Sequence, residues 1–129
     1  MGIENHVEFM GYRRDIAKLV AMCDVSVSAS RREGLPVNLI EASAIGKPIV
    51  ATKVRGNSDI VENGVNGFLV ELDNYEEMAE KLLEIYSNPQ LAQNMSQEAI
   101  RLSKKYSIEN VNKSLAEVYK KYGAEFSTI

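Results

Sequence analysis

The stretch SRREGLPVNLIEASAIGKPIVAT, residues 30–52, decides the fold, because it contains a loop, a well-punctuated helix and a short apolar strand in succession. Pro36 suits the first helical turn, where its missing N–H costs no hydrogen bond. Gly46 suits the left-handed position after the last turn, and Pro48 prevents the helix from continuing. The β-branched run that follows is typical of a strand buried on both faces of a sheet. This stretch therefore predicts a helix followed by an interior strand of a parallel sheet.

The rest of the chain repeats this alternation of short apolar runs with longer amphipathic stretches, which is typical of an α/β domain. Strands are predicted at Val7–Met10, Asp24–Ser28, Pro48–Thr52 and Phe68–Val70. Helices are predicted at about 14–22, 36–45, 74–86, 89–106 and 108–122, with a short one within 54–61. Asp73 and Glu76 form the pattern of a capping box, and Ser107 is predicted to cap the last helix. The expected fold is one Rossmann-like domain over residues 1–129, with a mostly parallel sheet flanked by helices.

Length, charge and cysteine content exclude several classes of protein. A chain of 129 residues is long enough for one domain with a sizeable core. The net charge of -3 argues against a dedicated nucleic-acid-binding protein. The single cysteine, Cys23, has no partner for an intrachain disulfide and is predicted to be a buried thiol in a reducing compartment. No apolar run approaches the ~18–20 residues of a membrane span and no signal peptide is apparent, so the expected location is the cytoplasm.

The chemistry is expected where the loop 29–35 meets the helix that starts at Pro36. In open parallel sheets this junction faces the ligand crevice, and the unpaired N–H groups at a helix start favour phosphate. Gly34 lets the backbone approach a ligand closely. Glu33 precedes the helix and Glu41 lies eight residues later, a rise of ~12 Å within a helix. Two carboxylates at this spacing could accept hydrogen bonds from hydroxyls at both ends of a ligand whose phosphates lie between them.

The Glu33-x7-Glu41 pattern resembles the donor-binding motif of the retaining GT-B glycosyltransferases known as group 1. Further blocks follow in the family's order. VEFMGY (7–12) resembles the family's strand and turn near the nucleotide base, and CDVSVSAS (23–30) resembles the strand before the motif. VRGNSDIVENGVNGFLV (54–70) resembles the two elements after the motif, and YSIENVNKSLAEVY (106–119) resembles the closing helix, which is expected here at 107–122. The match covers nearly the whole chain. The resemblance implies the C-terminal, donor-binding half of a GT-B fold that lacks its first two strands.

The resemblance also implies roles for individual residues. Glu33 would bind hydroxyls of the donor sugar and take the catalytic role, and Glu41 would bind the ribose hydroxyls. The backbone N–H groups implied for the sugar and the diphosphate belong to Gly34, Leu35, Val37 and Asn38. The residues implied to lie near the base are Gly11, Tyr12 and Arg13. No metal and no cofactor is implied, because the ligand is the substrate itself, a UDP- or GDP-linked sugar.

The implied reaction is transfer of a hexose from a nucleotide diphosphate sugar to an acceptor hydroxyl with retention of configuration, in polysaccharide or glycoconjugate biosynthesis, with the full-length enzyme at the inner face of the membrane. Family members carry an N-terminal acceptor domain, and the first two strands of their donor domain bring an arginine and a lysine to the diphosphate. Neither has a match in this sequence, so the isolated chain is expected to lack activity. The strand Asp24–Ser28 is then expected to expose an edge, which favours a homodimer through that edge. The closing helix is expected to expose an apolar patch.

Several alternatives stay open from the sequence. A non-catalytic oligomerisation or partner-binding module derived from a glycosyltransferase would contain the same blocks. An epimerase of the same architecture would need additional catalytic carboxylates and histidines, and His6 is the only histidine. Arg31 and Arg32 are either a solvated pair or part of a phosphate clamp, and residues 55–57 are either a simple turn or an approach to the donor or acceptor.

Overall fold

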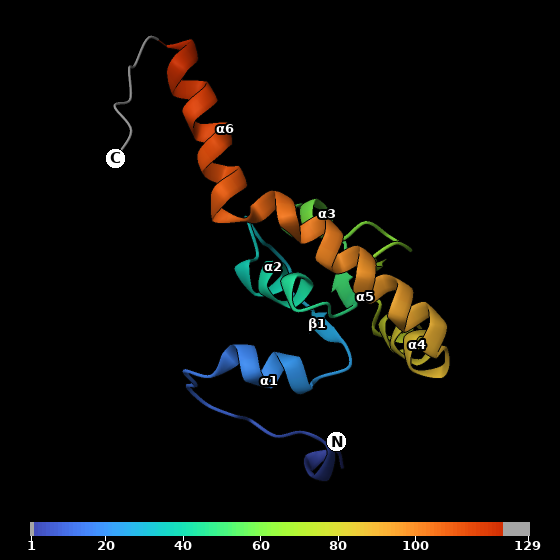
Figure 1. Cartoon of the computed structure of the whole chain (residues 1–129). Coiled ribbons are helices and arrows are strands. Elements are labelled where there is room, and N and C mark those ends of the chain that lie inside the picture. The colour runs from blue at the N-terminus through green and yellow to red at the C-terminus, as the bar shows by residue number, and fades with distance from the viewer. Residues whose placement is uncertain (1, 123–129) are drawn as a thin grey trace.

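The computed structural model describes residues 2–122, which form a three-stranded parallel sheet with helices packed around it (Figure 1). The strands are β1 (Ser26–Ser28), β2 (Ile49–Thr52) and β3 (Gly67–Val70), in the order β1-β2-β3. The helices are α1 (Ile16–Met22), α2 (Val37–Ala44), α3 (Arg55–Ile60), α4 (Tyr75–Ser87), α5 (Pro89–Ser103) and α6 (Ile108–Lys121), with single 3-10 turns η1 (Glu4–His6) and η2 (Lys104–Tyr106). The predicted α/β class with a parallel sheet flanked by helices is confirmed.

The central strand β2 connects two apolar clusters, because its side chains alternate between the two faces of the sheet. All four of its residues are buried. The first cluster contains Leu39, Ile49, Ala51, Ile60 and Val61, and the second contains Val50, Phe68, Val70, Ile85 and Met95. Helices α2 and α3 therefore contribute to one face of the sheet, and α4 and α5 to the other. Each large side chain that is fully buried in these clusters stabilises the fold by ~1.5–3 kcal/mol.

The helix α2 begins and ends within one residue of the predicted bounds. Pro36 is its N-cap, and the Pro36 carbonyl oxygen accepts a hydrogen bond from the N–H of Leu39 at 3.1 Å. Gly46 follows the helix with φ of 82°, the left-handed conformation that the sequence predicted. A Cβ at Gly46 would lie 2.9 Å from Ser96 Oγ and 3.0 Å from Ile100 Cδ1 of α5. Glycine is therefore required both by the backbone turn and by the close contact of this turn with α5.

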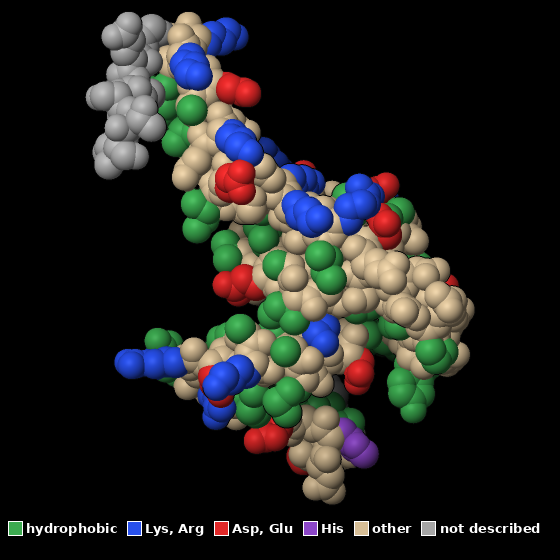
Figure 2. All heavy atoms as spheres, viewed as in Figure 1, with side chains coloured by type: hydrophobic (Ala, Val, Ile, Leu, Met, Phe, Trp, Pro, Cys, Tyr) green, Lys and Arg blue, Asp and Glu red, His purple; other side chains and the backbone are tan. Residues whose placement is uncertain are grey.

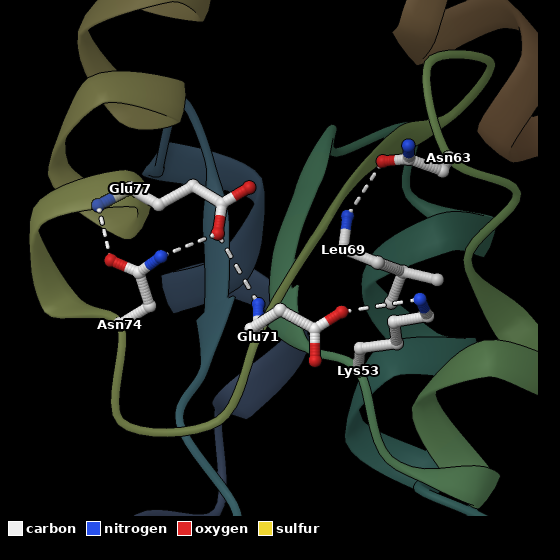
Figure 3. Close-up of polar contacts among 6 residues, drawn as sticks. All are labelled: Lys53, Asn63, Leu69, Glu71, Asn74 and Glu77. Carbon is white, nitrogen blue, oxygen red and sulfur yellow. Dashed lines mark hydrogen bonds and ion pairs between the residues drawn. The ribbon is translucent and has the colours of Figure 1, made fainter.

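The cap of α4 lies one residue later than the predicted box of Asp73 and Glu76, so that prediction was wrong. Asn74 is the N-cap: its Oδ1 accepts from the N–H of Glu77 at 3.2 Å, and its Nδ2 donates to Glu77 Oε2 at 2.9 Å (Figure 3). The same Oε2 accepts from the N–H of Glu71 at 3.3 Å, which ties the end of β3 to the helix. Asp73 instead adopts φ of 63° in the preceding turn and cannot serve as the cap.

The predicted strand Val7–Met10 is absent, and the segment is exposed, with Phe9 at 95%. Within residues 2–122, β1 pairs only with β2, and no strand lies next to Val7–Met10. An extended segment without a neighbouring strand has no partners for its backbone groups, which is why this prediction was wrong. β1 is shorter than the predicted 24–28 and lies at the edge of the sheet, as expected. A homodimer through this edge stays a prediction.

The residues around α1 are more exposed than the sequence suggested. None of the residues of α1 is buried, and the helix begins two residues later than predicted. Cys23 directly follows α1 and is exposed, with its Sγ 3.3 Å from the carbonyl oxygen of Leu19. The prediction of a buried thiol was therefore wrong, because the helix that presents Cys23 does not enter the core.

The last helix, α6, extends away from the sheet, and its apolar side chains are exposed (Figures 1 and 2). These side chains are Ile108, Val111, Leu115, Val118 and Tyr119, and Tyr122 at the C-cap is exposed as well. The expectation of an exposed apolar patch on this helix is confirmed. Ser107 is its N-cap, as predicted, and accepts from the N–H of Asn110. In the part of the chain that the structure describes, no helix combines the length and apolarity that crossing a bilayer requires.

Candidate functional site

The junction between β1 and α2 leaves several backbone donors free. The amide N–H groups that make no hydrogen bond within residues 2–122 include those of Gly34, Leu35, Val37 and Asn38. Because no side chain caps the start of α2, none of these N–H groups is occupied by a capping side chain. The junction follows the carboxyl end of β1, the edge where parallel α/β sheets bind ligands. Free N–H groups and the partial positive charge of a helix start suit an anion such as phosphate.

The carboxylate of Glu33 is held by the hydroxyl group of Ser30 in the same loop, and Ser30 is itself hydrogen-bonded from β1 and β2. Ser30 Oγ donates to Glu33 Oε1 at 2.6 Å, and Ser28 Oγ donates to Ser30 Oγ at 3.3 Å. Thr52, the last residue of β2, donates its hydroxyl to the carbonyl oxygen of Ser30. Asn57 of α3 is fully buried and donates its Nδ2 to the carbonyl oxygen of Thr52 at 2.9 Å. One oxygen of a half-buried carboxylate is thus fixed by groups from the loop, from β2 and from α3.

Gly56 of α3 packs directly against the turn formed by Glu33 and Gly34. A Cβ at Gly56 would lie 2.5 Å from the Gly34 carbonyl oxygen and 2.9 Å from the Cβ of Glu33, so a larger residue would force the turn to move. A Cβ at Gly34 would meet nothing within 4 Å. The turn is therefore supported from below by α3 and open on the side of Gly34.

An open cavity of about 630 Å³ adjoins this turn, lined by Arg31, Arg32, Glu33, Gly34, Val54, Arg55 and Asp59. Arg31 is bound bidentately to Asp73, with Nη2 2.6 Å from Oδ1 and Nη1 3.0 Å from Oδ2. Arg32 and Arg55 have no ion pair within residues 2–122. Their guanidinium groups are therefore available to an anionic group entering the cavity.

Glu33 and Glu41 line different cavities. The second cavity has a volume of about 240 Å³ and is lined by Ile16, Ala17, Val20, Glu41, Ala44 and Ile45, so it lies between α1 and α2. A ligand that contacts both carboxylates would have to run along α2 from one cavity to the other. The assignment of the two glutamates to opposite ends of one ligand stays a prediction.

The three residues implied for the base precede α1. Gly11 has φ of 62°, and Tyr12 is 89% exposed. Arg13 donates from Nη2 to Asp15 Oδ2 at 2.7 Å, and this hydrogen bond lowers the pKa of Asp15 below its ordinary value. Their contact with a base also stays a prediction. Among residues 2–122, no three or more His, Cys, Asp or Glu side chains gather in an arrangement that could hold a metal ion.

Comparison with known proteins assigns the chain to a family. A family model described as "Glycosyl transferases group 1" matches residues 1–102. The chain belongs to this family. The inferred glycosyltransferase EpsD of Bacillus subtilis (strain 168) is 34% identical over 122 residues, which cover 95% of this chain and 32% of EpsD. The N,N'-diacetylbacillosaminyl-diphospho-undecaprenol alpha-1,3-N-acetylgalactosaminyltransferase of Campylobacter jejuni is 31% identical over 105 residues, 81% of this chain and 28% of that enzyme.

Solved structures of other proteins contain the same fold. The crystal structure of Anabaena Alr3699/HepE in complex with UDP has a TM-score of 0.88 and 33% identity, covering 93% of this chain and 34% of HepE. The HepE complex with UDP-glucose has a TM-score of 0.84 and 32% identity. The sheet described above is the Rossmann-like one of the C-terminal GT-B domain. This chain spans about a third of the length of the curated relatives it matches first.

Sequence reasoning missed the residues that support the motif from outside it. Thr52, Gly56 and Asn57 lie 19 or more positions after Glu33 in the chain. Thr52 was predicted only as a strand end, and residues 55–57 were predicted either as a simple turn or as an approach to the donor or acceptor, not as a support for Glu33. The signal that could have found them is strand order. β2 is the parallel neighbour of β1, so the residues after β2 reach the same edge of the sheet as the motif loop.

Proposed function

We propose that this chain is the nucleotide-sugar-binding portion of a retaining glycosyltransferase that transfers a hexose from a nucleotide diphosphate sugar to an acceptor hydroxyl. The observation that carries the proposal is the group of free N–H donors beside Glu33, at the carboxyl end of β1. The HepE complexes with UDP and UDP-glucose support a UDP-linked donor. The Campylobacter relative, named for a lipid diphosphate-linked acceptor, supports a role in polysaccharide or glycoconjugate biosynthesis.

In this proposal the ligand lies along the start of α2. Glu33 accepts hydrogen bonds from sugar hydroxyls, and Glu41 accepts them from the ribose. The diphosphate lies against the N–H groups of Val37 and Asn38, while Gly34 and Leu35 lie beside the sugar. Gly11, Tyr12 and Arg13 lie near the base. These residues bind and orient the donor and stabilise the charge that develops on the leaving diphosphate, which are the main sources of rate enhancement in such a transfer.

We propose further that the isolated chain binds donor but does not transfer sugar. The acceptor domain of the family and the arginine and lysine that hold the diphosphate have no match in residues 1–129. The test is an assay of the purified chain with UDP- and GDP-linked hexoses and simple acceptors. Turnover above the rate of the heat-denatured chain would overturn this part of the proposal and leave the donor site intact.

The donor site is tested by calorimetric titration of the chain with UDP, GDP and UDP-glucose. We expect binding with a preference for one base, and a loss in Glu41→Ala of roughly 10- to 150-fold, since hydrogen bonds to a charged group contribute about 1.5–3 kcal/mol. Glu117→Ala is the matched control, because Glu117 is exposed on α6, far along the chain from the motif. Failure of the folded chain to bind any of the three ligands would refute the proposal.

A further inference from the structure

A chain of hydrogen bonds connects the interior of the domain to the carboxylate of Glu33. It begins at Asn57, which is 0% exposed and whose Nδ2 donates both to the Thr52 carbonyl oxygen at 2.9 Å and to Thr52 Oγ1 at 3.3 Å. Thr52, which is 4% exposed, donates in turn to the carbonyl oxygen of Ser30. Ser30 donates to Glu33 Oε1 at 2.6 Å. Asn57 and Thr52 are buried, so water does not replace a hydrogen bond that they lose, and their bonds hold a defined geometry.

The direction of the donors determines which part of Glu33 remains available. Oε1 is occupied by the Ser30 hydroxyl, and Oε2 has no hydrogen bond within residues 2–122. Glu33 lines the open cavity of about 630 Å³. The backbone on the other side of the residue is also fixed, because Gly56 contacts Glu33 and Gly34 directly. The arrangement therefore fixes one carboxylate oxygen and leaves the other for a ligand.

We propose that Ser30, held in place by Thr52 and Asn57, is a positioning residue that orients Glu33 toward the hydroxyl groups of the donor sugar. This inference rests on the proposed function, since it assigns the free oxygen of Glu33 to the sugar rather than to the nucleotide. A carboxylate free to rotate would lose rotamer entropy on binding, and a carboxylate already held by Ser30 loses less. The Ser30 hydroxyl therefore strengthens the recognition of the sugar and leaves that of the nucleotide unchanged.

The test compares the dissociation constants of UDP and UDP-glucose for the same variant, so that the ratio reports the contribution of the sugar. We expect Ser30→Ala to reduce the preference for UDP-glucose over UDP by about 3- to 10-fold, the size of one ordinary hydrogen bond, with UDP affinity unchanged. Thr52→Val should act in the same direction, since it removes the hydroxyl that fixes Ser30 and keeps the volume. Ser30→Thr retains a hydroxyl and should restore the preference. Ser58→Ala, an exposed serine on α3, is the matched control.

A second readout is independent of any ligand. Three-bond couplings of selectively labelled Glu33, measured by NMR, should indicate one side-chain rotamer in the unchanged chain and rotamer averaging in Ser30→Ala. If UDP does not bind at all, the proposed function fails while this readout still tests the positioning. An unchanged rotamer together with an unchanged sugar preference in Ser30→Ala would overturn the inference. Equal losses for UDP and UDP-glucose would overturn it as well, because they would mark a purely structural role.

Discussion

Replacement of Gly56 by alanine perturbs the contact that joins α3 to the motif loop. The added Cβ would lie 2.5 Å from the Gly34 carbonyl oxygen and 2.9 Å from the carbonyl carbon of Glu33. Both neighbours on this side are backbone atoms of the turn, so relief requires the turn or α3 to shift. Forcing an extra methyl group into packed structure costs about 1–3 kcal/mol of unfolding free energy. For a domain of this size the expected decrease in Tm is roughly 4–12 °C.

The assay is thermal and urea unfolding of the purified variant followed by circular dichroism, with Gly34→Ala as the matched control. Gly34 lies in the same contact, its φ is not left-handed, and a Cβ there would meet nothing within 4 Å. The control is therefore expected to stay within about 0.5 kcal/mol of the unchanged chain. If Gly56→Ala were as stable as Gly34→Ala, the turn would not be supported by α3 as described. A further expectation is weaker binding of UDP-glucose by Gly56→Ala at temperatures where the variant is fully folded.

Three further predictions concern stability. Leu39→Ala should lower the unfolding free energy in urea by about 2–5 kcal/mol, because Leu39 is fully buried on the core-facing side of α2. Val37→Ala, at a 59% exposed position of the same helix, should stay within about 0.5 kcal/mol; similar values for the two would contradict the assigned faces of α2. Asn74→Ala should lower the free energy of unfolding by about 1 kcal/mol, because it removes the N-cap of α4. Asp73→Gly should lower it by less, because glycine accepts the left-handed φ of 63°. The reversed order would favour the capping box of Asp73 and Glu76 that the sequence predicted. Arg13 lowers the pKa of Asp15, so the folded state binds the proton less readily than the unfolded chain. The resulting stabilisation is present above about pH 4 and is lost as the pH falls through the lowered pKa. The difference in Tm between the unchanged chain and Asp15→Asn should therefore shrink on acidification, and a difference that grows would contradict the pairing of Arg13 with Asp15.

The fold was predictable where local signals and burial agree. Gly46 and Pro48 fixed the end of α2, and the β-branched run after them predicted the fully buried β2. The signals failed where a local preference needs a tertiary partner. Val7–Met10 has the composition of a strand, but within residues 2–122 no neighbouring strand is present to pair with it. Composition cannot report whether such a neighbour exists.

The candidate site was predictable in its motif and not in its supports. Glu33, Gly34 and the helix start are contiguous in the chain, so the residue types and their order could be read directly. Thr52 and Asn57 are linked to Glu33 through Ser30, and only because β2 lies beside β1 and α3 follows β2. The separation of Glu33 and Glu41 into two cavities was equally hidden, because a rise along a helix does not indicate which neighbour each side chain faces.

The packing of α2 against both β2 and α5 has a consequence for the proposed binding of a phosphate. Leu39 anchors one end of the helix in the core, and Gly46, packed against Ser96 and Ile100 of α5, anchors the other end. Its amide dipoles therefore point in a fixed direction before any phosphate arrives, and no helical segment has to freeze at the moment of encounter. On binding, conformational entropy is then lost mainly by the ligand and by a few loop side chains, so the helix start is a preorganised binding site.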